Sequence, residues 1–484
     1  MSKIVSYLDF QQRVRRFRPS DLLPKLAATS IEFFEKDTWE QDRLRLPWAL
    51  AEISKASIVA GNEFRNSTVT ERDVVELCFE YSCLDDPLRQ KQTGLPGTLQ
   101  AFLVRLQFMQ FAYQLSPFEE VARITALFED VDRLGTEIIT TNFIKEMIGC
   151  TLHEYVNAGI AICSVAHNNR GFFNPSWDAL WSGPDSIQER FPMEIVTKVF
   201  HKHYLADFGF YKSQAAKFRQ TNHSLRQYEY NPLIGRPFAI LPNGNFLSPQ
   251  IHLAFGRIAP AAIYYSIVSD LDNDAANKFT RDIGLIFQHY VGRQLALIPG
   301  ATVLEEIHYD NDQRSVDWFL VTEKALVLIE AKATRMSHLG RMGADQLRSD
   351  IDRCLGRAQS QIERSDRLIR ERHSAFESLP RELPRLGLTV TLEPYWATTN
   401  PYLNRLISEA TIPSANLSIR QLEQLIGESI GHGNGSRLTD FLKSRRSPSS
   451  ELSQSSGTDN IVRNPILDAA WKSNPLWDAM FEHD

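Results

Sequence analysis

The sequence has few cysteines and no long apolar run, the features expected of proteins stabilised by disulfides or zinc and of membrane proteins. It contains only five cysteines in 484 residues, an odd number at irregular spacing with no Cys-x-x-Cys pair. This pattern argues against a disulfide framework or a zinc knuckle. No run approaches the roughly 20 apolar residues of a spanning helix, and the first residues lack the apolar core of a signal peptide. We therefore expect a cytoplasmic protein with reduced cysteines and no membrane contact.

Two further absences narrow the function. No Gly-x₄-Gly-Lys-Ser/Thr loop is present, which argues against an ATPase motor within this chain. The formal net charge is −6, so any contact with nucleic acid must come from a local basic surface. Hydrophobic residues make up 43% of the chain and charged residues 23%, which is ordinary globular composition. The length exceeds what one hydrophobic core supports, so we expect roughly two or three domains.

Helical periodicity dominates the first part of the chain. Residues 1–225 are expected to form an all-helical regulatory or recognition region, with N-cap chemistry such as Thr70 followed by acidic residues. Residues 226–278 are expected to form a hairpin and helix connector. The Asn243-Gly244 pair lies there between two short apolar runs, and Asn-Gly readily supplies the positive φ angles of a tight hairpin.

Strand signals appear only in the later part of the chain. Residues 279–445 are expected to form a domain with a mixed central sheet flanked by helices, which makes the fold class α+β or α/β. The predicted helix at 277–298 is followed by predicted strands at 302–310, 315–322, 324–334 and 386–398. An arginine-rich helical region at 342–372 precedes the last of these strands, and two helices follow it.

The end of the chain changes in composition. Residues 446–460 are rich in serine and almost free of apolar side chains, which predicts a linker. Residues 461–484 contain tryptophans and are expected to form a C-terminal tail that docks as a short helix.

The segment from Ser315 to Arg335 contains the candidate chemistry. It resembles two strands joined by a polar turn, and side chains alternate faces along a strand, so Glu330 and Lys332 should share one face. Asp317 begins the preceding strand, and an antiparallel hairpin would bring its carboxylate near Glu330. Two carboxylates and a lysine inside an apolar run are costly without a partner or a metal ion.

Hard divalent cations fit this group of side chains. Mg²⁺ or Mn²⁺ prefers oxygen ligands, which Asp317 and Glu330 supply as carboxylates, and the main-chain carbonyl of Ala331 is a third candidate. Lys332 would then face the open side of the metal ion, where its ammonium can stabilise charge on an attacked phosphate. The alternative is a structural salt bridge at a sheet edge.

Asp317 followed after twelve intervening residues by Glu330-Ala331-Lys332 resembles the motif of the PD-(D/E)XK nuclease superfamily, which includes restriction endonucleases and many bacterial defence nucleases. The resemblance covers roughly residues 279–398. It implies a restriction-endonuclease-like domain and divalent-metal-dependent hydrolysis of phosphodiester bonds. The implied partner is nucleic acid, with DNA expected before RNA, and anti-phage defence is the implied setting. A second copy of the chain or a separate protein remains open as a partner.

The resemblance also points to auxiliary positions. Gln288 stands where the family often carries an additional acid, and Val316 replaces the proline before the first acid. In some family members the helix after the Glu-x-Lys strand supplies a polar residue, for which Gln359 and Gln361 are the candidates. Each glutamine could equally be an ordinary helix residue. The neutral Gln288 is the feature that favours a second hypothesis, a catalytically silent nucleic-acid-binding or scaffold protein that retains the nuclease fold.

Two other groups of residues admit a functional interpretation. His201 and His203 flank Lys202, but the surroundings are helical, and residues two apart on a helix diverge, which disfavours metal binding. The arginine-rich region could form a phosphate-tracking face, although intrahelical ion pairing explains most of its members. These arginines are Arg348, Arg353, Arg357, Arg364, Arg367, Arg370 and Arg372.

Overall fold

The computed structural model describes most of the chain. The described residues are 4–36, 45–65, 68–90, 94–110, 113, 117–183, 188, 191–395, 410–431, 433, 435, 437–444 and 464–473. The predicted linker at 446–460 lies outside the described residues, as do most of the expected C-terminal tail and the last three positions of the predicted strand at 386–398.

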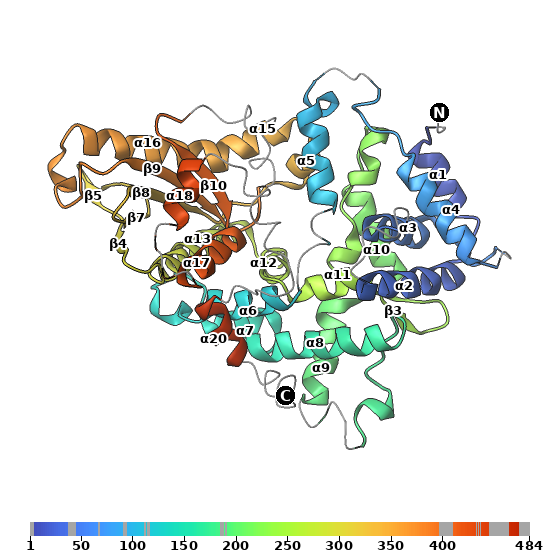
Figure 1. Cartoon of the computed structure of the whole chain (residues 1–484). Helices are drawn as coiled ribbons and strands as arrows, with labels where there is room; N and C mark the ends of the chain where they lie inside the picture. Colours follow the sequence, from blue (N-terminus) through green and yellow to red (C-terminus); the bar gives the residue numbers. More distant parts are fainter. Residues whose placement is uncertain are drawn as a thin grey trace.

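The chain has a mixed α+β fold whose first part is built mainly from helices, shown in blue to green in Figure 1. The helices up to residue 217 are α1 (Tyr7–Val14), α2 (Pro19–Lys36), α3 (Pro47–Ala60), α4 (Glu71–Ser82), α5 (Leu99–Gln110), α6 (Pro117–Phe128), α7 (Thr141–Ile148), α8 (Leu152–Asn168), α9 (Met193–Val199) and α10 (Phe208–Lys217). Thr70 caps α4 with a reciprocal capping box, as its sequence predicts. Among the residues described, no single helix is both long and apolar enough to cross a membrane.

A small sheet connects the helical part to the rest of the chain. The predicted hairpin is present as β2 (Phe238–Ile240) and β3 (Phe246–Leu247), which pair antiparallel, and Gly244 takes the positive φ of 84° in the turn. β1 (Leu205–Ala206) pairs parallel with β2. This strand lies inside the region expected to be all-helical, and two residues are too short to show strand alternation in the sequence.

The large sheet has five strands in the order β10-β9-β8-β7-β4. The strands of the second part are β4 (Thr302–Glu305), β5 (His308–Tyr309), β6 (Gln313–Arg314), β7 (Trp318–Val321), β8 (Leu326–Lys332), β9 (Arg385–Thr391) and β10 (Ser414–Ser418). The pairs β4–β7 and β7–β8 are antiparallel, whereas β8–β9 and β9–β10 are parallel. The mixed sheet is therefore present as expected.

Two details of the sheet differ from the sequence expectation. The single strand predicted at 302–310 is divided into β4 and β5, and β5 leaves the large sheet to pair with β6. The break falls at Glu306 and Ile307. β10 was not predicted, because its sequence SANLS has little apolar alternation and its place depends on its neighbour β9.

Helices cover both faces of this sheet (Figure 1). The remaining helices are α11 (Ile251–Phe255), α12 (Pro260–Val268), α13 (Asn273–Leu295), α14 (His338–Arg341), α15 (Gln346–Ile351), α16 (Arg357–Arg370), α17 (Ile419–Gly431), α18 (Arg437–Ser444) and α20 (Pro465–Lys472). One face packs Leu320, Val327 and Ile329 with apolar residues of α13 and α17. The other packs Phe319 and Leu328 with apolar residues of α16.

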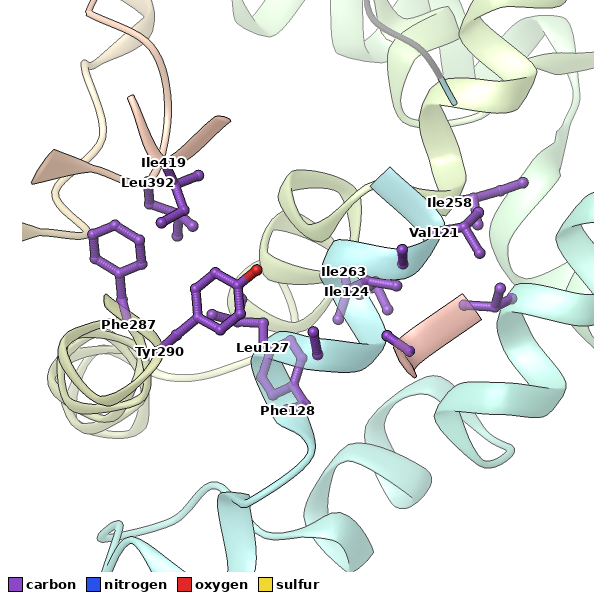
Figure 2. Packing of buried hydrophobic residues seen from close by; sticks show 14 of the residues in the cluster. Val121, Ile124, Leu127, Phe128, Ile258, Ile263, Phe287, Tyr290, Leu392 and Ile419 are labelled. Carbon is purple, nitrogen blue, oxygen red and sulfur yellow. The ribbon is translucent and has the colours of Figure 1, made fainter. Parts of the chain in front are cut away.

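One hydrophobic core continues from the helical part into the sheet domain. Leu127 and Phe128 of α6 belong to the same buried cluster as Phe287 and Tyr290 of α13, and the cluster extends to Leu392 beyond β9 (Figure 2). The sequence boundaries at 225 and 278 therefore do not separate independent cores. We infer that the helical part and the sheet domain support each other's folding.

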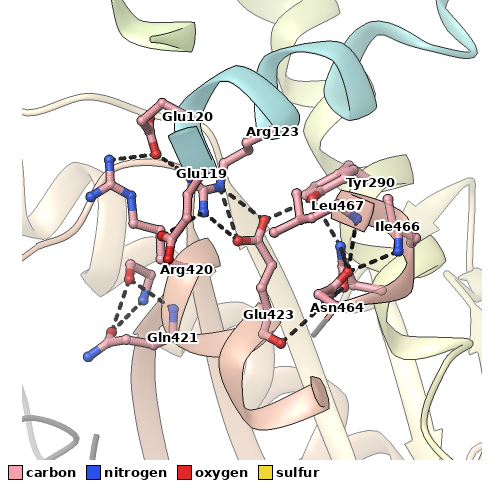
Figure 3. A network of polar contacts seen from close by, with 12 residues as sticks. Glu119, Glu120, Arg123, Tyr290, Arg420, Gln421, Glu423, Asn464, Ile466 and Leu467 are labelled. Atoms are coloured by element: carbon pink, nitrogen blue, oxygen red, sulfur yellow. Dashed lines mark hydrogen bonds and ion pairs between the residues drawn. The ribbon is translucent and has the colours of Figure 1, made fainter. Parts of the chain in front are cut away.

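A buried ionic network lies where these parts meet (Figure 3). Arg123 of α6 donates through its guanidinium to both carboxylate oxygens of Glu423 on α17, and its Nε lies 3.0 Å from each. Tyr290 of α13 donates to Glu423 Oε1 at 2.8 Å, and Arg420 pairs with Glu120 at 2.8 Å. Arg123 and Glu423 are almost fully buried, so each compensates a charge that would otherwise be costly.

The same network anchors α20, which forms the short docked helix expected from the tail. The Asn464 side chain accepts from the backbone N–H groups of Ile466 and Leu467, and it donates to Gln294 at 2.7 Å and to the Glu423 carbonyl at 3.2 Å. The tail helix is thus joined to α13 and α17 through buried hydrogen bonds.

Substitution of Arg123 by methionine should destabilise the whole protein, because it leaves Glu423 buried with a reduced set of partners. We expect a loss on the order of 3 kcal/mol, seen as a lower thermal unfolding midpoint. The matched control is Arg133→Met, which removes an arginine whose side chain is 85% exposed. That change should alter stability by less than about 0.5 kcal/mol. Equal midpoints for the two variants would contradict a stabilising role for the network.

Candidate active site

The hairpin of β7 and β8 contains the residues predicted to carry chemistry. Its register pairs Trp318 with Ile329 and Val321 with Leu326, which confirms the expected antiparallel pairing. The Thr322 hydroxyl stabilises the turn by donating to the Ala325 carbonyl at 3.0 Å. Trp318 and Ile329 are the last pair of the ladder, so Asp317 and Glu330 lie at its open end.

Asp317 completes this end of the ladder with its side chain. The Leu326 N–H donates to the Pro384 carbonyl, and the Lys332 carbonyl accepts from the Leu392 N–H. The even-numbered residues of β8 therefore direct their main-chain N–H and C=O groups toward β9. Odd-numbered residues, including Ala331, direct theirs toward β7. Since β7 has ended there, the Ala331 N–H donates to Asp317 Oδ2 at 2.7 Å. The Ala331 carbonyl points to the same side of β8 as this N–H, and thus toward Asp317.

Glu330 is the most buried member of the site. Its side chain is 1% exposed, and one of its oxygens, Oε1, accepts from the Lys332 ammonium at 2.5 Å. The other oxygen, Oε2, is buried and makes no hydrogen bond of good geometry to the described residues, although the Asp317 main chain lies close enough to lower the pKa of this carboxyl slightly. An unpaired buried carboxylate oxygen is costly, so this atom marks a place where a proton or a cation is needed.

Lys332 lies between the strand and a helix. Its Nζ donates to Gln361 Oε1 of α16 at 2.8 Å as well as to Glu330. The Lys332 side chain is 18% exposed, whereas that of Glu330 is 1% exposed. Gln361 was predicted as one of two auxiliary candidates on this helix, and the structure brings it to the site.

Burial controls the electrostatics of the two acids. Desolvation raises the pKa of Glu330 well above that of an ordinary glutamate, and the negative charge of Asp317 raises it further, against the opposing effect of Lys332. Desolvation also raises the pKa of Asp317, although the Ala331 N–H and Lys332 oppose the rise. Lys332 and Arg314 act against the rise at Asp317, but Glu306 adds a third negative charge to those of Asp317 and Glu330, so near neutral pH the acids favour an added positive charge.

The donor set fits a hard divalent cation. Asp317 and Glu330 supply carboxylate oxygens, one of them unsatisfied, and the Ala331 carbonyl is directed to the same side. No group of three or more His, Cys, Asp or Glu side chains with metal-binding geometry occurs among the described residues. A cation held here would therefore complete its coordination with the carbonyl and water, as Mg²⁺ commonly does.

The other two predicted auxiliary glutamines are not brought to the site. Gln288 lies on α13, where its main-chain carbonyl accepts from the Trp318 indole at 3.0 Å. Trp318 packs into the core on the α13 face, whereas Glu330 and Lys332 project to the α16 face, where Lys332 meets Gln361. Gln359 donates along its own helix to Glu363 at 3.0 Å.

The structure adds one acid that the sequence argument missed. Glu306, in the break between β4 and β5, is close enough for its charge to raise the pKa of Asp317 further. Its side chain is 15% exposed and lies 3.6 Å from Arg314 and 3.4 Å from His308. The sequence contains a pair of glutamates at 305 and 306, but the strand predicted at 302–310 was continuous, whereas the structure breaks it at Glu306.

The predicted histidine pair lies in a helical turn, and its described contacts are those of a buried structural residue. His203 lies in the π-helical turn Phe200–Tyr204, is buried, and bonds through Nε2 to the Ile148 carbonyl at 2.8 Å. Burial lowers its pKa to about 3, and the helical setting expected for this pair is confirmed. All five cysteines are buried, and none forms a disulfide with a described residue.

Some of the predicted arginines pair within their helices, and others face the site. Arg353 pairs with Asp350 and Arg370 with Asp366, three and four residues away. Arg357 and Arg364 lie four residues before and three residues after Gln361 on α16, so they share its helix face. Arg364 Nε is buried without a hydrogen-bond partner among the described residues.

Comparison with known proteins identified no relative: no protein-family model, curated protein or solved structure matches this chain.

Substitution of Glu330 by glutamine should raise the stability of the metal-free protein at pH 8. The raised pKa means that wild-type stability is greatest with the carboxyl protonated and falls as pH rises through the folded-state pKa. We expect a gain on the order of 1 kcal/mol at pH 8, which shrinks as pH approaches 4. The measurement is thermal unfolding in EDTA across this pH range.

The matched control is Glu323→Gln, which changes an exposed acid in the turn of the same hairpin. It should leave the pH dependence unchanged. A Glu330→Gln variant that is less stable than wild type at pH 8, with the same pH profile, would show that the carboxylate is a simple salt-bridge partner.

Proposed function

We propose that this protein is a divalent-metal-dependent nuclease that hydrolyses phosphodiester bonds, with a restriction-endonuclease-like sheet domain. The observation that carries the proposal is the unsatisfied Oε2 of Glu330, buried beside a second carboxylate at the end of the β7–β8 ladder. A purely structural salt bridge would need one acid for one lysine. Here two buried acids and an aligned carbonyl surround the place where a cation is needed.

Asp317, Glu330 and the Ala331 carbonyl would hold Mg²⁺ or Mn²⁺. A bound divalent cation supplies Lewis-acid polarisation of a phosphoryl oxygen and lowers the pKa of a coordinated water molecule. The Ala331 N–H holds Asp317 in place at 2.7 Å, so this carboxylate is preorganised before any ligand arrives.

Lys332 is the proposed catalytic residue for charge stabilisation. Gln361 and Glu330 both accept from its ammonium group, and the third N–H would bind a phosphate oxygen. An ammonium in this position stabilises the negative charge that develops on the attacked phosphate. Gln361 is a positioning residue, because it acts through Lys332.

The polar face of α16 supports nucleic acid as the substrate class. Arg357 is exposed on the face of the helix that also presents Gln361, whereas the Arg364 guanidinium on this face donates to the Arg314 carbonyl at 2.9 Å. Arg357 would contact a phosphate close to the bond that is cut. DNA is the first substrate to test and RNA the second.

The helical part is proposed to recognise the target or a partner protein. This extension to anti-phage defence in the cytoplasm rests on the motif resemblance and on the large part of the chain outside the sheet domain. A second copy of the chain is one candidate partner, because cutting both strands of a duplex with one site per chain favours a dimer.

A catalytically silent nucleic-acid-binding protein is the second candidate. It is favoured by the direct Lys332–Glu330 ion pair and by α13, which offers the neutral Gln288 on the opposite side of the sheet from Glu330. Such a protein would bind DNA or RNA without cutting either.

Substitution of Lys332 by methionine should reduce cleavage of plasmid DNA or RNA in Mg²⁺ or Mn²⁺ by about 10²-fold or more, because the developing charge loses its ammonium partner. EDTA should abolish wild-type cleavage. The matched control is Lys324→Met, at the turn of the same hairpin, where the lysine is half exposed and pairs with Asp440. If the wild type cleaves neither DNA nor RNA, with or without Mg²⁺ or Mn²⁺, the nuclease proposal is overturned. If the Lys332→Met and Lys324→Met variants cleave equally well, the role of Lys332 is overturned.

Substitution of Arg357 by alanine should weaken nucleic-acid binding at all sequences, because a phosphate contact carries no sequence information. The slope of log K against log salt should fall in magnitude by about 1, measured by fluorescence anisotropy between roughly 50 and 200 mM salt. Arg367→Ala, an exposed position on another face of α16, is the control. An unchanged salt slope for Arg357→Ala would exclude this face of α16 from the interface.

A further inference from the structure

The helical part contains a cavity far along the chain from the candidate active site. It has a volume of about 140 Å³ and lies between α1, α3, α10 and the 3₁₀ turn His223–Tyr228. The polar side chains among its lining residues are Tyr7, Gln11, Lys55, Arg219, Arg226 and Glu229. Three of the four charged members are cations, so the lining attracts an anion.

Lys55 is the buried cation of this cavity. Its side chain is 4% exposed, and its Nζ has no hydrogen bond to any described residue. The ammonium lies 2.8 Å from Glu52 Oε1, and this ion pair lowers the pKa of Glu52. A buried ammonium has three N–H groups to satisfy, and Glu52 is its one ion-pair partner among the described residues, so two of these N–H groups can still bind a ligand.

Glu52 compensates Lys55 only in part. Its Oε1 already accepts from the Tyr7 hydroxyl at 2.5 Å. Burial raises the pKa of Glu52 to about 7, although Lys55 and Tyr7 act in the opposite direction. Near neutral pH a fraction of the Glu52 carboxyls is therefore protonated, which leaves part of the Lys55 charge uncompensated.

The two arginines at the mouth of the cavity also lack acidic partners. Arg226 Nε makes only a long contact of 3.5 Å with the Gln220 carbonyl, and Arg219 makes no side-chain hydrogen bond or ion pair with any described residue. Glu229, the acid among the lining residues, accepts from the Gln220 N–H at 2.7 Å. The two guanidinium groups are thus free to bind a ligand from the solvent side.

We propose that this cavity binds a phosphate group, either inorganic phosphate or the 5′-phosphate of a mononucleotide. The volume is well below the roughly 300–1,000 Å³ typical of pockets for drug-sized ligands, which fits a compact anion. Lys55 contacts the phosphate from inside as a point charge, and Arg219 and Arg226 contact it from outside with paired N–H groups. Gln11 donates a further hydrogen bond through its amide.

The test is isothermal titration calorimetry of the full chain with inorganic phosphate, 5′-AMP and adenosine at constant ionic strength. We expect binding of inorganic phosphate and of 5′-AMP, and none of adenosine. Tighter binding of 5′-AMP identifies a nucleotide site, and equal or weaker binding of 5′-AMP identifies a site for the free anion. Absence of binding by both phosphate compounds, or equal binding of adenosine and 5′-AMP, overturns the proposal.

Arg219→Ala should weaken phosphate binding by about tenfold, the effect of losing one charge-assisted contact. Lys212→Ala removes an exposed lysine of α10, seven residues before Arg219, that does not line the cavity, and this variant should bind phosphate like the wild type. Equal losses in the two variants would show a general charge effect and overturn the site. Lys55→Met tests the buried cation and should abolish binding. If that variant does not fold, the result with Arg219→Ala decides.

Discussion

The candidate active site depends on the place where the β7–β8 ladder ends. Beyond the last pair, Trp318 and Ile329, the main-chain groups of Ala331 face a side with no strand, and the Asp317 carboxylate accepts the free N–H. This one hydrogen bond fixes an acid next to a second acid, Glu330, and leaves the Ala331 carbonyl facing the same side. Ordinary strand geometry thereby concentrates oxygen atoms at one point.

The rest of the molecule holds this point in position. On one face of the sheet, Gln361 of α16 accepts from Lys332. On the other face, Gln288 and Gly292 of α13 contact Trp318. A Cβ at Gly292 would clash with the indole ring, so a side chain at this position would push α13 away. The core of the helical part continues into α13, and the Arg123–Glu423 pair joins the two parts. His338, six residues after Lys332, packs against Phe218 and Tyr230 of the helical part and connector.

The sequence predicted the local features of the site well and the long-range ones poorly. Strand alternation and the polar turn were enough to place Asp317, Glu330 and Lys332 together, because a hairpin is local. Choosing between Gln359 and Gln361 required the rotation of α16, and excluding Gln288 required the face of the sheet on which α13 packs. Glu306 was missed because β4 breaks where a continuous strand was expected. The rotation of α16, the position of α13 and the break after β4 depend on tertiary packing, so the spacing of residues along the chain does not predict them.

The measurement that tests the site most directly is calorimetric titration of the full chain with Mn²⁺ at pH 7. The titration is repeated in two buffers of different ionisation enthalpy, which gives the number of protons released. Because burial raises the pKa of both carboxyls, cation binding should displace protons, so we expect one tight Mn²⁺ per chain with net proton release. Asp317→Asn should lose this binding. Absence of Mn²⁺ binding, or the same affinity in Asp317→Asn, would contradict a metal site at the end of the β7–β8 ladder.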